Sequence, residues 1–262
     1  GLRTAASSSI TGSRTDVAGP VTDILMYHSI SGQGGPTSIA PAVFAAQMQA
    51  IAGAGVPVIT LDDFCGAKAR GAVLPARSVI ITFDDGFQDF ADAAWPAMRD
   101  LGFRPIVFLP TNYIGGREGW HGIASPPRKL MDWDTIRRLQ AEGVIFGSHT
   151  ESHPELDTLA PEAVEAELTR SRDRIAAELG AAPRHFAPPY GIASAAVRAR
   201  IARLYRTSVG TRLGTAHAAA DLHDLPRLEM FYFTDLARWR AHLAGRGGGY
   251  LALRRTLRAV RG

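Results

Sequence analysis

From residue 20 onward, short runs of apolar residues alternate with segments in which apolar residues recur every three or four positions. The first pattern is typical of buried β-strands and the second of amphipathic helices. Because the two alternate along the chain, we expect a parallel sheet with helices outside it, and at this length a (β/α) barrel. The expected strands are Asp23–Tyr27, Pro57–Leu61, Ser78–Phe83, Arg104–Leu109, Gly143–Phe146, His185–Ala187, Arg206–Val209 and Arg227–Phe231. The expected helices are Ala42–Gly53, Asp62–Arg70, Asp89–Leu101, Trp133–Glu142, Pro161–Leu179, Ser194–Tyr205 and Leu236–Ala244.

Two stretches fall outside this alternation. Residues 1–19 are rich in Ser, Thr, Gly and Ala, which predicts a flexible tail and leaves residues 20–262 as a single domain. The segment Thr111–Met131 contains four glycines and two prolines and fits neither pattern. A loop this long in a compact domain is more often functional than accidental. Because it follows an expected strand, we expect it at the end of the barrel that carries the chemistry.

The charge balance is mildly basic, with 29 Lys and Arg against 25 Asp and Glu and a formal net charge of +4. The arginines are scattered along the expected helices as on solvated faces, so we expect no nucleic-acid binding. The densest basic cluster is C-terminal, where Arg254, Arg255, Arg258 and Arg261 alternate with leucines. This cluster predicts either a peripheral contact with an anionic membrane surface or an ordinary terminal helix.

The cellular location is open. The single cysteine, Cys65, cannot form an internal disulfide, and no apolar run approaches the roughly 20 residues of a membrane span. No signal peptide is visible, but the chain begins with Gly rather than Met. We therefore expect an extracytoplasmic location if a leader was removed and a cytoplasmic one otherwise. The sequence leaves the oligomeric state unknown.

The strongest local signal is an apolar strand that runs directly into Asp84, Asp85 and Gly86. In a (β/α) barrel this is the C-terminal end of a strand, where active sites are built. Adjacent carboxylates repel each other unless a cation or a proton lies between them. The alternative is a solvent-exposed turn, for which Asp-Asp-Gly is a common composition.

A second signal, His149 to His153, also follows an expected strand. Two imidazoles four residues apart face one point if the segment makes one helical turn. Two histidines and a carboxylate are a usual ligand set for catalytic zinc, with one position open for water. Taken alone, this spacing is also compatible with coincidence.

Three weaker signals complete the pattern. Pro188 and Pro189 make a rigid turn that can present the backbone N–H of Tyr190 at a fixed place. His28 follows the first expected strand, and Arg227 enters a late one.

Each motif is a modest signal alone, but together, in this order and each at the end of an apolar run, they form a specific pattern. On these residues, from roughly Asp23 to Phe231, the chain resembles the polysaccharide deacetylases of carbohydrate esterase family 4, the NodB-homology domain. The resemblance implies a distorted (β/α) barrel of about seven parallel strands with outer helices. It also implies metal-dependent hydrolysis of the N-acetyl groups of N-acetylhexosamine residues in a polysaccharide, with release of acetate.

The family motifs assign roles to matching positions. Thr82–Gly86 matches the motif TFDDG, which implies that Asp84 is the catalytic base and Asp85 a metal ligand. His149 and His153 match the ligand histidines of the motif H(S/T)xxH. The matched proline-tyrosine motif implies that Pro188, Pro189 and Tyr190 line the groove and that the Tyr190 N–H stabilises the oxyanion. The metal is expected to be zinc, with nickel or cobalt as alternatives.

The chain departs from the common family pattern at two places. Many members carry an arginine before the proline pair, where this chain has Ala187. We expect Arg227 to pair with Asp84 instead. Many members also take a catalytic acid from a C-terminal histidine, but His242 lies in a helix-like stretch and is expected on its surface. His28 fits a rearranged order similar to the deacetylases of exported poly-N-acetylglucosamine and is the expected acid, with Met26 beside the acetyl methyl group.

The substrate rim is expected to include Trp120, Tyr113 and His121, because aromatic faces suit sugar rings. Loop packing is the alternative for these residues. Two other functions also remain possible: hydrolysis of another small amide or imide on the same scaffold, and non-catalytic sugar binding.

Overall fold

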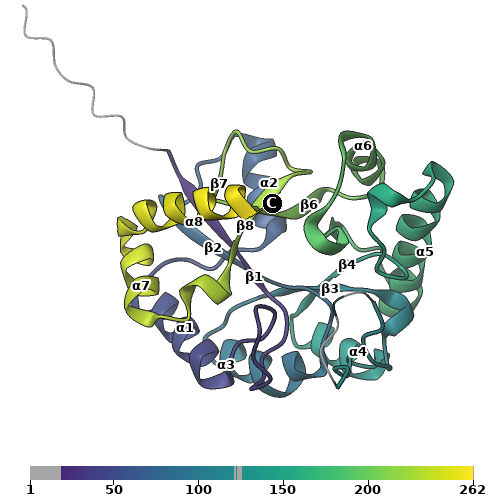
Figure 1. The fold of residues 1–262 in the computed structure, drawn as a ribbon, viewed down its shortest axis with the longest axis horizontal. Helices are drawn as coiled ribbons and strands as arrows, with labels where there is room; N and C mark the ends of the chain where they lie inside the picture. The colour runs from purple at the N-terminus through teal and green to yellow at the C-terminus, as the bar shows by residue number, and fades with distance from the viewer. Residues whose placement is uncertain (1–18, 121, 123–125, 262) are drawn as a thin grey trace, which may run out of the picture.

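The computed structural model describes residues 19–120, 122 and 126–261 (Figure 1). Seven parallel strands close into a barrel, because β1 pairs with both β2 and β8, and β7 joins β1 in the antiparallel direction. The strands are β1 (Val21–Tyr27), β2 (Arg77–Phe83), β3 (Ile106–Leu109), β4 (Ile145–Ser148), β5 (His185–Phe186), β6 (Thr207–Leu213), β7 (Ala216–His217) and β8 (Leu225–Glu229). The predicted barrel is therefore confirmed. Apart from Gly19, the expected N-terminal tail lies outside the described residues.

Helices surround the strands, as the ring of α1, α3, α4 and α5 shows in Figure 1. None of the described helices is both long and apolar enough to cross a membrane. The helices are α1 (Pro41–Gly53), α2 (Leu61–Arg70), α3 (Trp95–Arg99), α4 (Trp133–Ala141), α5 (Pro161–Leu179), α6 (Ala195–Leu204), α7 (Leu236–Ala241) and α8 (Gly248–Arg261). Single turns are η1 (Phe90–Ala94), η2 (Thr111–Tyr113), η3 (Leu156–Thr158), η4 (Pro189–Gly191), η5 (Met230–Phe233) and η6 (His242–Arg246).

Alternating strand residues form two apolar layers. Ile24, Ile80 and Ile106 belong to one buried cluster, which also takes in Leu61 and Phe64 of α2. Their neighbours in the same strands belong to a larger cluster that packs against the outer helices. This is the period-two alternation of a strand with both faces buried. Asp62 of α2 pairs with Arg184, the residue before β5, and Leu61 and Phe64 pack against Ile24 and Ile80, so α2 lies at the end of the barrel where the strands begin.

Three sequence predictions need correction. The strand expected at Pro57–Leu61 is reduced to an isolated bridge between Val58 and Val79, because a capping box at Thr60 starts α2 there. The helix expected at Asp89–Leu101 is divided into η1 and α3, where Pro96 supplies no backbone N–H for a continuous α-helix. The last expected helix, Leu236–Ala244, leaves the α form after Ala241 and continues as η6.

A fourth correction concerns His242, which is buried and does not lie on the helix surface. Its Nε2 lies 2.9 Å from Oδ2 of Asp23 in β1, and its ring stacks on Trp239. Arg77 donates to the same carboxylate oxygen at 2.6 Å. Asp23 stands early in β1, away from the end that carries His28, so this buried polar cluster joins η6 to the barrel wall.

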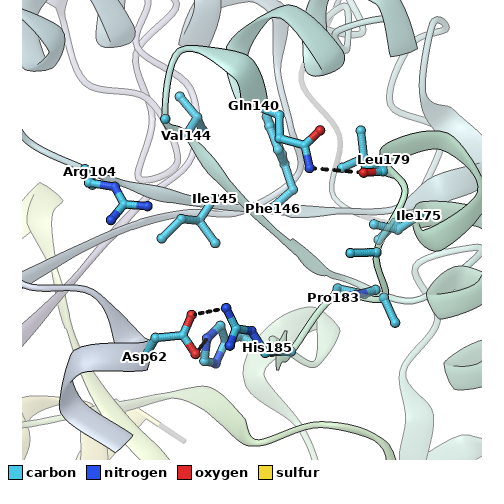
Figure 2. A pocket seen from close by; sticks show the side chains of 14 residues that line it. Asp62, Arg104, Gln140, Val144, Ile145, Phe146, Ile175, Leu179, Pro183 and His185 are labelled. Carbon is cyan, nitrogen blue, oxygen red and sulfur yellow. Dashed lines mark hydrogen bonds and ion pairs between the residues drawn. The ribbon is translucent and has the colours of Figure 1, made fainter. Parts of the chain in front are cut away.

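A hollow opens where β4 and β5 begin, at the end of the barrel opposite Asp84, His149 and the other candidate site residues (Figure 2). Asp62 pairs there with Arg184 at 3.0 Å and lies 3.3 Å from Nε2 of His185, whose Nδ1 lies 2.8 Å from Oγ1 of Thr207. The Asp62 carboxylate thus has the Arg184 guanidinium and the His185 imidazole as its neighbours. We therefore interpret the cluster as a link between α2 and the strands β5 and β6.

Candidate metal centre and active site

The C-terminal ends of the strands open into a second hollow of about 390 Å³. Segments after five different strands, β1 to β5, bring distant residues together here, as expected for a (β/α) barrel. Arg227, Pro188 and Pro189 are buried beside this lining. Of the residues predicted from the sequence, those that line the hollow are Met26, His28, Asp84, Asp85, Trp120, His149, His153 and Tyr190.

Asp85, His149 and His153 form a compact ligand set. Oδ1 of Asp85 lies 3.3 Å from Nε2 of His149 and 3.3 Å from Nε2 of His153, and one ligand atom of each residue falls within 4.8 Å of the others. All three residues are buried. Two imidazoles and a carboxylate converging on one point fit a divalent cation, with coordination positions left over for water.

The orientation of His149 supports this interpretation. Its Nδ1 lies 2.7 Å from the backbone oxygen of Ala187. A proton on Nδ1 donates to that oxygen, which leaves the lone pair of Nε2 facing Asp85. Nδ1 of His153 is buried and has no hydrogen-bond partner among the described residues.

The ligand turn is held in an unusual backbone conformation. Among the described residues, the non-glycine residues with positive φ are Asp85, Thr150, His153 and Tyr190, and all four belong to this site. Thr150 is β-branched, for which φ of 71° is costly. Its hydroxyl donates to the His149 carbonyl and accepts from the His153 backbone N–H at 3.0 Å, which closes the turn.

Glu167 of α5 holds the same turn from outside. Its carboxylate accepts the backbone N–H groups of Glu151 and Ser152 at 2.8 and 2.9 Å, and also the Ser152 hydroxyl. The two amides lie between the ligand histidines in the sequence. Glu167 therefore fixes the segment that spaces the ligands, a role that no sequence pattern indicated.

Gly86 explains how two adjacent aspartates point to different partners. Asp85 has φ of 74° and Gly86 has φ of 68°, so the chain turns sharply after β2. A Cβ at Gly86 would lie 2.8 Å from Cδ2 of Leu109, so a larger residue does not fit. The Asp84 backbone N–H donates to the Tyr27 carbonyl at 2.9 Å and keeps this loop against β1.

Asp84 is paired with Arg227, as the sequence predicted. Two guanidinium nitrogens donate to the two carboxylate oxygens at 2.7 Å each, and the remaining donors reach Thr82 at 3.0 Å and the Gly210 carbonyl at 2.7 Å. Both side chains are almost fully buried. Burial opposes ionisation of Asp84, but the charge and hydrogen bonds of Arg227 outweigh it and lower the pKa of Asp84 below its ordinary value.

His28 lies on the Asp84 side of the hollow. Its Nε2 is 3.8 Å from Oδ2 of Asp84, and its side chain is 16% exposed, so it can be reached from solvent. Met26 is buried two residues earlier and also lines the hollow. Glu229, at the end of β8, lines the same side, and burial raises the pKa of its carboxyl group above the ordinary value.

The proposed rim residues differ in their surroundings. Tyr190 is 36% exposed, and its ring meets the His153 ring edge-on at 4.9 Å. Trp120 stacks on His153 with centroids 4.3 Å apart, and Tyr113 packs against the edge of Trp120. His121 lies outside the described residues. Trp120 of the long segment thus lies against His153, and the buried pair Glu118–Arg128 joins two described parts of the segment at 2.8 Å.

The C-terminal helix α8 also reaches the hollow. Arg258 lines it and donates to the Thr211 carbonyl at 3.1 Å, while the guanidinium of Arg254 lies 3.8 Å from the centre of the Tyr232 ring. Two of the four clustered arginines therefore contact the protein itself. Leu253 and Leu257 are exposed, and a contact between this helix and an anionic surface stays a prediction.

Comparison with known proteins agrees with this site. A family model described as polysaccharide deacetylase matches residues 72–209, more than half of the chain. The chain therefore belongs to the polysaccharide deacetylase family. The match spans both aspartates, both ligand histidines and Tyr190, whereas His28 and Arg227 lie outside it.

Individual relatives cover the chain in part. A chitooligosaccharide deacetylase from Bradyrhizobium sp. (strain ANU 289) is 34% identical over 165 residues, which are 63% of this chain and 66% of the relative. A poly-beta-1,6-N-acetyl-D-glucosamine N-deacetylase from Staphylococcus epidermidis is 30% identical over 113 residues, 43% of this chain and 38% of the relative. The chain spans 49% of the length of a further relative from Bacillus subtilis.

Solved structures extend the likeness to most of the chain. The deacetylase PplD of Streptococcus pyogenes, in complex with acetate, has a TM-score of 0.70 at 25% identity and covers 79% of this chain and 91% of its own. IcaB from Ammonifex degensii has a TM-score of 0.74 at 19% identity and covers 88% of this chain and 98% of its own, which shows a shared fold.

Proposed function

We propose that the protein hydrolyses the N-acetyl groups of N-acetylhexosamine residues in a polysaccharide and releases acetate. It would thus act as a hydrolase of carbon–nitrogen bonds other than peptide bonds. The observation that carries this proposal is the position of a buried, arginine-paired carboxylate next to a three-residue ligand set in an open hollow. Family membership and the deacetylase names of the relatives support the substrate class.

Asp85, His149 and His153 would hold the divalent cation. When bound, the cation supplies a Lewis acid that polarises the acetyl carbonyl and lowers the pKa of a coordinated water. Zinc is the proposed ion because two imidazoles and a carboxylate are its usual catalytic set, and nickel and cobalt suit the same donors.

Asp84 is the proposed general base. Its lowered pKa keeps it ionised at neutral pH, and Arg227 fixes the plane of its carboxylate through both oxygens. Each carboxylate oxygen has a second lone pair, so Asp84 can still accept the proton of the attacking water. In this role Arg227 takes the place of the arginine that is absent at Ala187.

His28 is the proposed general acid. An amide nitrogen leaves only after it gains a proton, because a free amide anion is a very poor leaving group. The Nε2 position, 3.8 Å from Asp84 and open to the hollow, allows His28 to donate to the departing amine.

The substrate would be oriented by the residues around this centre. We assign the Tyr190 backbone N–H to the developing oxyanion and Met26 to the acetyl methyl group. Pro188 and Pro189, both buried, fix the turn in which Tyr190 has φ of 59°. Trp120 would offer an aromatic face to the sugar ring.

The proposal is tested by acetate release from N-acetylglucosamine oligomers before and after chelation, with zinc added back. We expect chelation to abolish release and zinc to restore it. His149→Ala should remove both the bound metal and the activity, whereas His217→Ala, at an exposed histidine, serves as the matched control. Bound metal without release from any oligomer would instead favour a small-amide hydrolase, and release that survives complete metal removal would contradict the proposal.

A further inference from the structure

The Asp89 side chain accepts hydrogen bonds from the two residues that follow His28. Oδ2 of Asp89 accepts the Ser29 hydroxyl at 2.5 Å, and Oδ1 accepts the Ile30 backbone N–H at 2.9 Å. Ser29 is buried, with 1% of its surface exposed. The two donors are the first two residues after the proposed acid, so they govern where the His28 backbone can lie.

Asp89 lies in the same connection after β2 as the proposed base, at the helix start that follows the loop. Only four residues separate it from Asp84, and the loop between them is anchored. Gln88 donates its backbone N–H to the Lys129 carbonyl at 2.9 Å, and Phe90 donates to the Phe87 carbonyl at 3.1 Å. One connection after β2 therefore carries the base, a metal ligand and the carboxylate that holds the segment after β1.

Hydrogen bonds within the loop after His28 also hold Ser29 in place. Ser29 forms backbone hydrogen bonds with Thr37 and Ile39, each at 3.0 Å, so the loop returns to the point that Asp89 holds. The Ser29, Ser31 and Ser38 hydroxyls continue this contact, with oxygen separations of 2.9 and 2.8 Å. The loop is thus tied at its base to the β2 loop.

We infer that Asp89 is a positioning residue that sets the distance between the acid His28 and the base Asp84. This inference rests on the proposed function. Placing a proton donor within reach of a leaving group is sensitive to small shifts, since a misplacement of about 1 Å can cost about 100-fold in rate. Asp89 does not touch the substrate in this role and acts through His28 alone.

The test compares the hydrolysis rates of two substrates, of which only one has a leaving group that needs a proton. Hydrolysis of the acetamide breaks a C–N bond, and the amine departs with a proton supplied by His28. Hydrolysis of 4-nitrophenyl acetate breaks a C–O bond, and the nitrophenolate departs without a proton. We expect Asp89→Ala to lower kcat on N-acetylglucosamine oligomers about 100-fold with KM and metal content unchanged, and to leave the aryl ester rate within about twofold of wild type.

A double-mutant cycle that combines Asp89→Ala with His28→Ala tests the same point on the N-acetylglucosamine oligomers alone. Asp89→Ala should have little further effect once His28→Ala is present, because both changes remove the same proton donor. Asp89→Asn keeps one acceptor for the Ile30 N–H and should recover part of the loss. Asp92→Ala, at an exposed aspartate three residues further on, is the matched control and should behave as wild type.

Three outcomes would overturn the inference: equal losses on the amide and the ester, a full additional loss in the His28→Ala background, or wild-type kinetics in Asp89→Ala. A wild-type protein that releases no acetate would contradict the proposed function instead. In that case the inference is decided by the structure of Asp89→Ala, where an unmoved His28 ring would refute the positioning role and a displaced ring would support it.

Discussion

Replacement of Arg227 by methionine should separate the structural and catalytic uses of the Asp84–Arg227 pair. Methionine is unbranched and fills much of the space of the arginine stem without its charge. The variant leaves the Asp84 carboxylate buried without its two hydrogen bonds from the guanidinium, and it leaves the Gly210 carbonyl without the Arg227 donor. Because both side chains of the pair are almost fully buried, solvent screens their interaction little.

Removing one partner of a buried ion pair typically costs about 3–5 kcal/mol, because the other charge stays buried and unpaired. The cost should depend on pH. In the wild type the pKa of Asp84 is lowered, so its stabilising contribution is present above the ordinary carboxyl pKa of about 3.9 and is lost as pH falls through the lowered pKa. In the variant, the largest effect that opposes burial is removed, so the pKa of Asp84 should rise and a proton should relieve the penalty as pH falls from neutrality.

The assay is urea unfolding of both chelated proteins at pH 7.5 and pH 5. We expect a loss of about 3–5 kcal/mol at the higher pH and a smaller loss at the lower one. The double variant Asp84→Asn/Arg227→Met should be more stable at pH 7.5 than Arg227→Met alone. A loss below about 1 kcal/mol, or one that does not shrink at pH 5, would refute the buried-pair argument. Turnover should also fall, and its acid limb should move to higher pH, with metal content little changed.

Three further predictions concern the rest of the site. Asp84→Asn should keep the metal, measured by elemental analysis, and lower acetate release by about 100- to 10,000-fold, since it removes the base; full activity would exclude that role. Glu167→Ala should weaken zinc binding about 10- to 100-fold in a chelator competition, whereas Glu165→Ala on the same helix should not, and equal affinities would show that the turn needs no outer support. Trp120→Ala should raise KM for oligomers by up to about tenfold, and an unchanged KM would place the sugar elsewhere.

That the candidate site residues would lie together was predictable because most of them follow apolar runs, and strand ends meet at one face of a parallel barrel. The pairing of Arg227 with Asp84 was predictable because Arg227 lies in a late strand, although it is outside the stretch that matches the family model. The strand at Pro57–Leu61 was predicted wrongly because its apolar run is shared with the start of α2, where the Thr60 capping box decides the conformation.

The supporting residues could not be predicted in this way. Glu167 occupies a polar position of α5 that the sequence does not distinguish from a solvated one, and only the approach of the ligand turn gives it its three hydrogen bonds. Asp89 was assigned to a helix start, where an aspartate is common. His242 was placed on a helix surface because its partner, Asp23, is 219 residues away.

Closure of the barrel between β8 and β1 has a consequence for how the protein loses function. The ligand set comes from one continuous stretch of sequence between Asp85 and His153, whereas Arg227 lies on β8 and His28 follows β1. Only two residue pairs register β1 with β8, against seven with β2. A local opening at that junction would separate Arg227 from Asp84, while the metal ligands stay together and His28 stays beside Asp84 through the pairing of β1 with β2. Under mild denaturation, turnover would therefore vanish while the ion is still retained, and an inactive but metal-loaded fraction would report an opened barrel.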